Sequence, residues 1–279
     1  VLYGTSFAPI DHSAEIVGES YTVVVIDTNF TLTELRSEQG RALIKTRLES
    51  AVQAALKLNP DYILLPEDAR YFNQANDVRI EQALFSFRAQ APTVVIVDSG
   101  RADTDEKAVL QSFVYNGIEQ TVDQSHKRYL VPQGEFMPSL YASVLRTIGK
   151  GEIVDQVSRT LTFRTGANSS QAHYAQTTPG ILFCFESVDP NGVRKILQER
   201  DVPFVAHPVS HAWFHEPHIL WQQLDTMLRV QAVWNQVYIV SAGNHVAGQI
   251  VTPKGYITYP ETVITDEYWS LGITEIPVQ

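Results

Sequence analysis

The sequence alternates short β-branched runs with longer segments in which apolar residues recur at helical spacing. Residues 22–27, Thr-Val-Val-Val-Ile-Asp, are the first run, and their composition predicts a core strand. Residues 33–58 follow with the apolar spacing of a helix. Residues 62–67 then predict a second strand, which ends in Glu67. Because strand, helix and strand in this order favour parallel pairing with helices outside the sheet, we predict an α/β protein.

The later part of the sequence continues this pattern. Asn116-Gly117 separates two runs, residues 108–115 and 118–122, and so predicts a β-hairpin with a type I′ turn. Further strands are expected at residues 93–97, 159–164, 203–206, 237–240, 246–251 and 256–259, and further helices at 78–89, 191–200 and 217–234. Neither an internal repeat nor an interdomain linker interrupts the 279 residues. We therefore expect one domain over residues 1–279, with its core at about residues 22–260.

Charge and composition exclude several classes of protein. The chain has 21 Lys and Arg against 31 Asp and Glu, a formal net charge of −10. Nucleic-acid partners need basic patches to neutralise phosphates, so we expect none here. No apolar run approaches the roughly 20 residues that cross a bilayer. The chain begins at Val1 without an initiator Met, which suggests an excised domain or a processed product.

Three segments place side chains of related chemistry at or just beyond the ends of predicted strands. The only cysteine, Cys184, ends an apolar run in Gly-Ile-Leu-Phe-Cys-Phe-Glu. Glu67 ends the run Tyr-Ile-Leu-Leu-Pro-Glu, and Lys127 is followed eight residues later by Glu135. A glutamate, a lysine and a cysteine in this order are the parts of a cysteine acyl-transfer site. A single cysteine also excludes an intramolecular disulfide and CxxC zinc sites.

These motifs resemble those of the carbon–nitrogen hydrolase, or nitrilase, superfamily, whose members use a Glu-Lys-Cys triad with a second supporting glutamate. Within it they are most similar to the catalytic domain of bacterial apolipoprotein N-acyltransferases. Residues 127–136 match that family's Lys-Arg-His-Leu-Val-Pro-Phe-Gly-Glu-Tyr-like segment, and residues 184–186 match its Cys-Tyr-Glu-like motif. Residues 210–214 match its Asn-Asp-Ala-Trp-Phe loop, and the whole resemblance runs from about residue 22 to residue 258.

The resemblance implies a four-layer α-β-β-α sandwich of the nitrilase type and a reaction that needs neither a metal nor another cofactor. It also implies membrane helices before and after the catalytic domain, to which the terminal segments would be linkers. The domain would then lie on the extracytoplasmic side of the bacterial inner membrane. A soluble amidase of the same superfamily would instead lie in the cytoplasm.

The expected roles follow from thiol chemistry. A thiol with a pKa of about 8.5 is only a few per cent ionised at neutral pH and is a weak nucleophile until it loses its proton. Glu67 is expected to be the general base for Cys184. Lys127 would favour the thiolate and stabilise the oxyanion, with the backbone N–H of Phe185 as a second donor. Glu135 would hold Lys127 in place.

Two reactions fit this site. In an acyltransferase, Cys184 takes an acyl group from a phospholipid as a thioester and passes it to the N-terminal amine of a lipoprotein. In a soluble amidase or nitrilase-like hydrolase, water takes the place of the amine. Glu186 would bind the amine or help to position the acyl donor, and Trp213 and Phe214 would line an acyl-chain groove or face lipid, although such aromatic residues are more often core.

The chain departs from the acyltransferase family at three places. His211 stands where the family has Asp, Gln133 stands where it has Phe, and Gly243-Asn244-His245 replaces Asn-Asn-Gly or Asn-Thr-Gly. These departures leave open a third interpretation, a binding domain that keeps the fold without the activity. The intact triad argues against it.

A histidine-rich stretch contains candidate metal ligands, but its spacing does not match a metal site. The candidate ligands are His207, His211, His215, Glu216 and His218. The order His-Glu-Pro-His is not the His-Glu-x-x-His of zinc proteases, and Pro217 would break the helix that such a site requires. We therefore expect no metal.

Overall fold

The computed structural model describes residues 19–72, 91–102, 109–119, 121–132, 135–160, 163, 165–166, 176–212 and 218–278. Its strands are β1 (Ser20–Thr28), β2 (Tyr62–Leu64), β3 (Val95–Ala102), β4 (Val109–Asn116), β5 (Thr121–His126), β6 (Gly180–Ile181), β7 (Val205–Ser210), β8 (Ile239–Asn244), β9 (Ile250–Val251), β10 (Ile257–Thr258), β11 (Glu261–Thr265) and β12 (Trp269–Pro277). Its helices are α1 (Leu32–Arg36), α2 (Glu38–Leu56), α4 (Ser139–Thr147), α5 (Gly151–Thr160), α6 (Gly192–Glu199), α7 (His218–Asn235) and the 3₁₀ helix η1 (Cys184–Val188).

The strands form two groups that meet at one point. In the first group, β1 pairs along all of its residues with β12 and runs parallel to β2. β3, β4 and β5 continue the sheet beyond β2. In the second group, β7 runs parallel to both β6 and β8, and β9 and β10 follow. The groups join where Thr28 of β1 pairs with Asn244 of β8.

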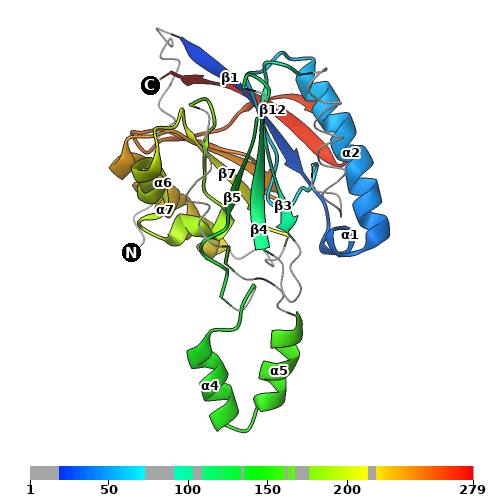
Figure 1. Ribbon diagram of the computed structural model, residues 1–279, viewed down its shortest axis with the longest axis vertical. Helices are drawn as coiled ribbons and strands as arrows, with labels where there is room; N and C mark the ends of the chain where they lie inside the picture. Colours follow the sequence, from blue (N-terminus) through cyan, green and yellow to red (C-terminus); the bar gives the residue numbers. More distant parts are fainter. Residues whose placement is uncertain are drawn as a thin grey trace, which may run out of the picture.

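The packing of alternate residues shows that the molecule has four layers. In β1, Val24 and Ile26 pack with α2, whereas Val23 and Val25 pack with residues of β6, β7 and β8. Successive strand residues point to opposite faces, so the run of four apolar residues in β1 contributes to two hydrophobic cores. The second group packs its other face against α6 and α7. Figure 1 shows α2 on one side of the strands and α6 with α7 on the other. The expected four-layer α-β-β-α sandwich is therefore confirmed.

The strongly patterned elements lie where the sequence predicts them. The strands expected at residues 22–27 and 93–97 are confirmed as β1 and β3, and the helices expected at 191–200 and 217–234 are α6 and α7. The helix expected at 33–58 is in fact two helices, α1 and α2. Ser37 separates them because its backbone is extended (φ −90°, ψ 150°), and its hydroxyl caps the N–H of Gly40 at 3.0 Å.

The hairpin of β4 and β5 is confirmed, but its predicted type I′ turn is wrong. That turn requires positive φ at both central residues, and neither Asn116 nor Gly117 has positive φ. Instead, the side-chain oxygen of Asn116 accepts the backbone N–H groups of Ile118 and Glu119, at 3.0 and 3.1 Å. The turn is longer than two residues, since Asn116 pairs with Thr121 across the hairpin, and the Asn116 side chain supplies a local hydrogen-bond acceptor within it.

Three other expectations have different outcomes. The sheet does not close at residue 259, because β12 pairs with β1 over its whole length and is part of the core. The prediction of a strand at residues 159–164 is wrong for its first two residues, because α5 extends through Thr160. The helix expected at 78–89 lies outside the described residues.

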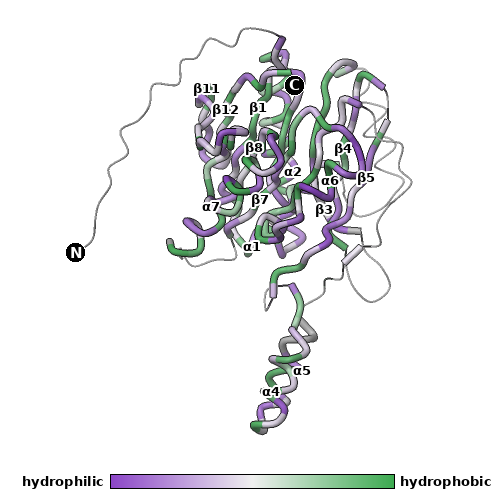
Figure 2. Tube along the Cα trace, turned by 90° about the vertical axis from the view of Figure 1, so that its left-hand side faces the viewer, coloured by the Kyte–Doolittle hydropathy of each residue, from purple (hydrophilic) through white to green (hydrophobic). Residues whose placement is uncertain are grey.

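Helices α4 and α5 were not anticipated, and they project from the body of the molecule as a hairpin (Figures 1 and 2). The two helices are held together by Ala142, Leu145 and Val154.

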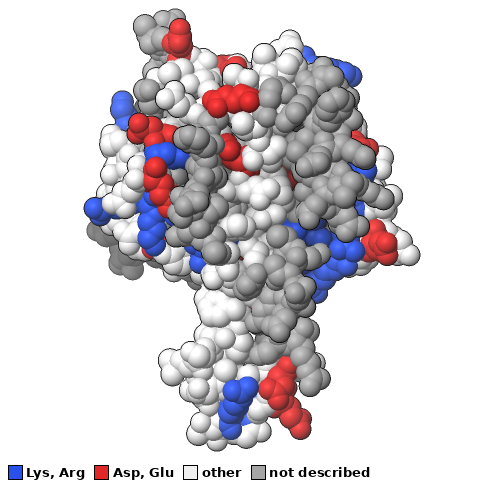
Figure 3. All heavy atoms as spheres, viewed as in Figure 1, with Lys and Arg blue, Asp and Glu red and all other residues white. Residues whose placement is uncertain are grey.

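Figure 3 shows acidic and basic side chains intermixed on one face of the molecule. Among the described residues, no helix is long and apolar enough to cross a membrane.

Candidate active site

Lys127 lies at the centre of the proposed site, one residue after β5. Its backbone N–H donates to the carbonyl of Leu110 at 2.8 Å, which fixes the start of the side chain. Its Nζ atom donates to Glu67 Oε1 at 2.9 Å and to Glu135 Oε1 at 2.7 Å. The lysine side chain has no exposed surface. Burial acts to lower the pKa of Lys127, but the charges of Glu67 and Glu135 raise it above its ordinary value.

Glu135 fixes the loop that follows Lys127. Its second carboxylate oxygen, Oε2, accepts the backbone N–H of Val131 at 2.7 Å, and its own N–H donates to the carbonyl of Val131 at 2.8 Å. The carboxylate therefore binds the ammonium group with one oxygen and the protein backbone with the other. A lysine held in this way has little freedom to change rotamer, as a group that stabilises a transition state requires.

Glu67 reaches the site from the end of β2. The segment after the strand stays against β3, because the N–H of Leu65 donates to the carbonyl of Val97 at 3.0 Å. The Glu67 side chain is buried. Burial raises its pKa to about 7, with Lys127 acting to lower it and Glu135 acting to raise it. A carboxyl group with a pKa near neutrality is suited to general base and general acid catalysis.

Asp68, which the sequence did not single out, anchors the turn that carries Glu67. Its carboxylate binds Arg70 through both oxygens, at 2.7 and 2.9 Å, and binds Arg101 of β3 at 2.6 Å. Burial acts to raise the pKa of Asp68, but the two guanidinium charges hold it below its ordinary value. Its N–H donates to the Ser99 hydroxyl at 2.9 Å. These contacts tie the turn to the neighbouring strand β3.

Cys184 is the first residue of η1, three residues after β6 ends. The thiol is buried, and Sγ lies 3.9 Å from the carbonyl oxygen of Ser210 at the end of β7. Burial raises the pKa of the thiol well above its ordinary value, and the charge of Glu67 raises it further while Lys127 acts to lower it. The resting group is therefore a neutral thiol. To act as a nucleophile, such a thiol would need a base to take its proton.

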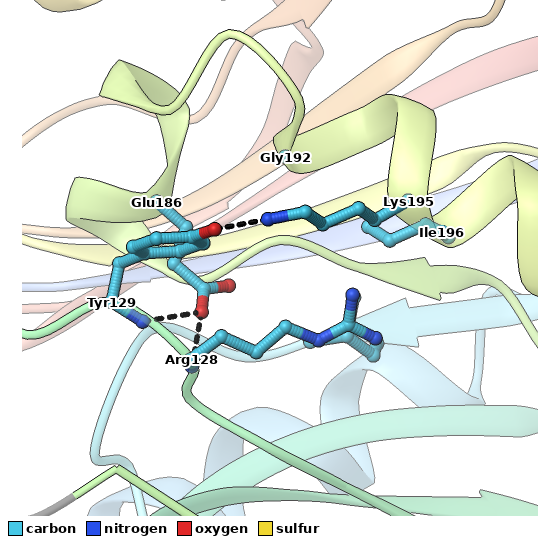
Figure 4. A pocket seen from close by; sticks show the side chains of 7 residues that line it. Arg128, Tyr129, Glu186, Gly192, Lys195 and Ile196 are labelled. Atoms are coloured by element: carbon cyan, nitrogen blue, oxygen red, sulfur yellow. Dashed lines mark hydrogen bonds between the residues drawn. The ribbon is translucent and has the colours of Figure 1, made fainter. Parts of the chain in front are cut away.

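Glu186 connects the segment that carries Cys184 with the segment that carries Lys127. One carboxylate oxygen, Oε1, accepts the backbone N–H groups of Arg128 and Tyr129, at 2.5 and 3.2 Å. The other, Oε2, accepts the N–H of Phe183 at 2.9 Å. Figure 4 shows the carboxylate pointing toward Arg128 and Tyr129. Both oxygens are thus engaged by the protein itself, which indicates a positioning role in addition to the substrate contact expected from sequence.

Three further site residues are expected from the sequence, and the structure describes one of them. Phe185 lies in the first turn of η1, where a helix does not satisfy its own N–H groups. Trp213 and Phe214 lie outside the described residues, so their expected contact with substrate stays a prediction.

His207 and His211, two of the residues considered as metal ligands, are both buried. Burial lowers the pKa of each ring to about 4, so both are neutral. His207 lies between the Cys184 carbonyl and Ser241, whereas His211 stacks on Trp221 with ring centroids 5.3 Å apart. In the part of the chain that the structure describes, no three His, Cys, Asp or Glu side chains gather as a metal site would require.

The fold is similar to that of solved amidases and a related hydrolase. An amidase of Nesterenkonia sp., in a structure showing covalent addition of the acetamide moiety of fluoroacetamide at its active-site cysteine, superposes with a TM-score of 0.61 at 14% identity. The alignment covers 93% of this chain and 91% of the amidase. A carbon–nitrogen hydrolase of Helicobacter pylori gives a TM-score of 0.57 at 12% identity, covering 91% of this chain and 88% of the hydrolase.

Another structure of the Nesterenkonia amidase, which is described as a member of the nitrilase superfamily, gives a TM-score of 0.61 at 13% identity over 92% of each chain. At these identities the similarity establishes the fold, which is that of nitrilase-superfamily enzymes. The sequence itself matches neither a protein-family profile nor a curated protein.

Proposed function

We propose that this chain is a cysteine-dependent enzyme that hydrolyses the carbon–nitrogen bond of an amide through a thioester intermediate. The observation that carries the proposal is the buried ammonium group of Lys127, held between Glu67 and Glu135 and acting electrostatically on the Cys184 thiol. A fully buried lysine costs free energy unless its charge is used or paired. Here it is paired with two carboxylates beside the protein's only thiol.

The reaction begins when Cys184 Sγ attacks the carbonyl carbon of the amide and Glu67 takes the thiol proton. The carbonyl oxygen becomes an oxyanion, which Lys127 and the N–H of Phe185 stabilise. Glu67 then gives its proton to the leaving nitrogen, so that the carbon–nitrogen bond breaks and ammonia or an amine departs. An acyl thioester remains on the cysteine.

The second half repeats these steps with water. Glu67 takes a proton from water as the oxygen attacks the thioester carbon, and the same two donors stabilise the new oxyanion. The carbon–sulfur bond breaks, and the proton held by Glu67 returns to the cysteine sulfur. The products are a carboxylic acid and the free enzyme.

A second candidate is acyl transfer from phospholipid to the N-terminal amine of a lipoprotein, with the same thioester. It is supported by the match at residues 127–136 and by a row of exposed apolar residues on α4, which begins four residues after Glu135. Leu140 and Val144 of α4 and its C-cap residue Ile148 are 78%, 50% and 59% exposed at a spacing of four residues, so they lie along one side of the helix that acyl chains are able to contact. This reaction would place the domain at the extracytoplasmic side of the bacterial inner membrane.

Amide hydrolysis is the better supported of the two because the solved structures that share this fold include amidases. The test offers the protein a panel of short aliphatic amides and measures ammonia release, with intact-protein mass spectrometry to detect the acyl adduct. In parallel it receives phospholipid vesicles and a diacylglyceryl-cysteine peptide, and the N-acylated peptide is measured. Cys184→Ala is the control in both arms. Peptide acylation without amide hydrolysis would replace the first proposal by the second, and an absence of any adduct on Cys184 would refute both.

A further inference from the structure

The peptide group between Cys184 and Phe185 has a second set of contacts on its carbonyl side. This group supplies the N–H that the proposed mechanism uses as an oxyanion donor. Its carbonyl oxygen lies 3.1 Å from His207 Nε2 and accepts the Ser187 hydroxyl at 3.0 Å. Both side chains are buried.

The contacts of His207 determine which ring nitrogen carries the proton. A carbonyl oxygen only accepts hydrogen bonds, so Nε2 must donate to it. Because burial keeps the ring neutral, Nδ1 is then the acceptor of a hydrogen bond that the Ser241 hydroxyl donates, with Nδ1 and Oγ 2.9 Å apart. The side chain is therefore held in one tautomer and one orientation.

The strands fix this arrangement. His207 of β7 and Ser241 of β8 are paired residues of two parallel strands. The preceding residue of β7, Ala206, pairs with Ile181 of β6, and η1 begins three residues after Ile181. The ring is thus carried by the same three strands that position Cys184. Placement on rigid strands gives a site more precision than placement on loops.

We propose that His207 is a positioning residue that orients and polarises the Cys184–Phe185 peptide group as an oxyanion donor. A donor on the carbonyl oxygen draws electron density from the amide nitrogen, and hydrogen bonds linked in this way strengthen one another. It also holds the plane of the peptide group, and with it the direction of the Phe185 N–H. The inference rests on the proposed function, because it assigns His207 to the oxyanion of that reaction.

The test compares two reactions of the same sulfur. Acylation of Cys184 by p-nitrophenyl acetate passes through an oxyanion, whereas alkylation by iodoacetamide is a displacement at a saturated carbon and forms none. His207→Leu should slow acylation by about 10- to 100-fold, less than the roughly 10²–10³ lost with an oxyanion donor itself, and should leave alkylation within about twofold. His207→Gln keeps an N–H at similar reach and should restore acylation to within about threefold of the wild type.

Two further variants sharpen the result. Ser187→Ala removes a second side-chain donor to the same carbonyl with a small change of volume, and should give the same pattern with a smaller loss. His245→Asn is the matched control, since His245 Nε2 lies 2.9 Å from a different carbonyl, that of Phe30. It should leave both rates unchanged.

Each outcome has one meaning. Equal acylation rates in the wild type, His207→Leu and Ser187→Ala would overturn the inference alone, and so would a parallel loss of alkylation, because His207 would then act by placing the sulfur. If His207→Leu does not fold, Ser187→Ala decides. A wild-type protein that is alkylated but never acylated would instead refute the proposed function, and the inference with it.

Discussion

The Nζ atom of Lys127 lies 2.9 Å from Glu67 Oε1, and the exposed fractions of the two side chains are 0% and 7%. With Glu135 at 2.7 Å, one buried ammonium group faces two carboxylates. Burial is the main cause of the raised pKa of the Cys184 thiol, and the charge of Glu67 raises that pKa further. In the proposed reaction, deprotonation of Cys184 would therefore accompany its attack on the substrate, and Glu67 would accept the proton.

The first prediction concerns pH. Because the pKa of Glu67 is raised to about 7, the carboxylate that the proposed reaction uses as base forms only as pH rises through that value. We expect kcat/KM for the best amide substrate to fall roughly tenfold per pH unit below about pH 7, well above the pKa of an ordinary glutamate. Glu67→Gln should abolish turnover at every pH. If kcat/KM fell only below pH 4 to 5, the base would be another group.

The second prediction concerns the buried charge cluster. Lys127→Met leaves Glu67 and Glu135 without their cation, and loss of one partner from a buried ion pair costs about 3–5 kcal/mol of folding free energy. Urea unfolding at pH 8 measures this loss. The double variant Lys127→Met, Glu135→Gln should recover part of it, since one uncompensated charge is removed. Equal stability of the single and double variants would contradict the interpretation that Lys127 compensates the charge of Glu135.

The third prediction separates positioning by Glu186 from acceptor binding. Glu186→Gln replaces one acceptor oxygen with an NH₂ group that faces a backbone N–H, and should cost about 1–3 kcal/mol of stability. It should lower activity toward every acyl donor, because the carboxylate joins the Lys127 and Cys184 segments. Glu199→Gln, at a side chain 50% exposed and paired with Arg128, is the control and should change stability by less than about 0.5 kcal/mol. A loss confined to transfer to amines would favour the substrate role.

The sequence predicted the elements whose apolar spacing is regular and the motifs that follow them. Lys127 and Glu135 illustrate this, because both belong to a local segment whose spacing is visible in the sequence. The structure adds relationships between distant segments. Glu186 contacts Arg128, and His207 contacts the carbonyl of Cys184. No local pattern encodes either contact, because each depends on which strands become neighbours.

The C-terminal strand is a second feature that local sequence patterns do not predict. β12 contains Glu275 and Gly272 between its apolar residues, so its pattern is weak. Its partner β1 lies some 250 residues earlier in the chain, with Ser20 opposite Pro277. Pairing at this separation is decided by the whole fold and not by local propensity.

The fourth prediction tests whether β12 belongs to the core. Leu271 has no exposed surface and packs within the cluster that α2 covers. Leu271→Ala should therefore cost about 2–5 kcal/mol of unfolding free energy. Val263→Ala on the adjacent strand β11 is the control, because that side chain is 42% exposed and should matter little. Thermal and urea unfolding of the two variants measure the difference, and equal losses would argue that β12 is only loosely attached.

The last prediction concerns the thiol and stability at high pH. Burial raises the pKa of Cys184 above its ordinary value, so at a pH between the unfolded and folded pKa the unfolded chain loses this proton while the folded protein keeps it. The native state binds more protons there, and stability must fall as pH rises. One such group contributes at most about 1.4 kcal/mol per pH unit. Cys184→Ala removes this contribution, so urea unfolding between pH 8 and pH 10.5 should show a smaller decline in the variant than in the wild type. Parallel declines would mean that the thiol already ionises in the folded protein, and that Cys184 enters the reaction as a preformed thiolate.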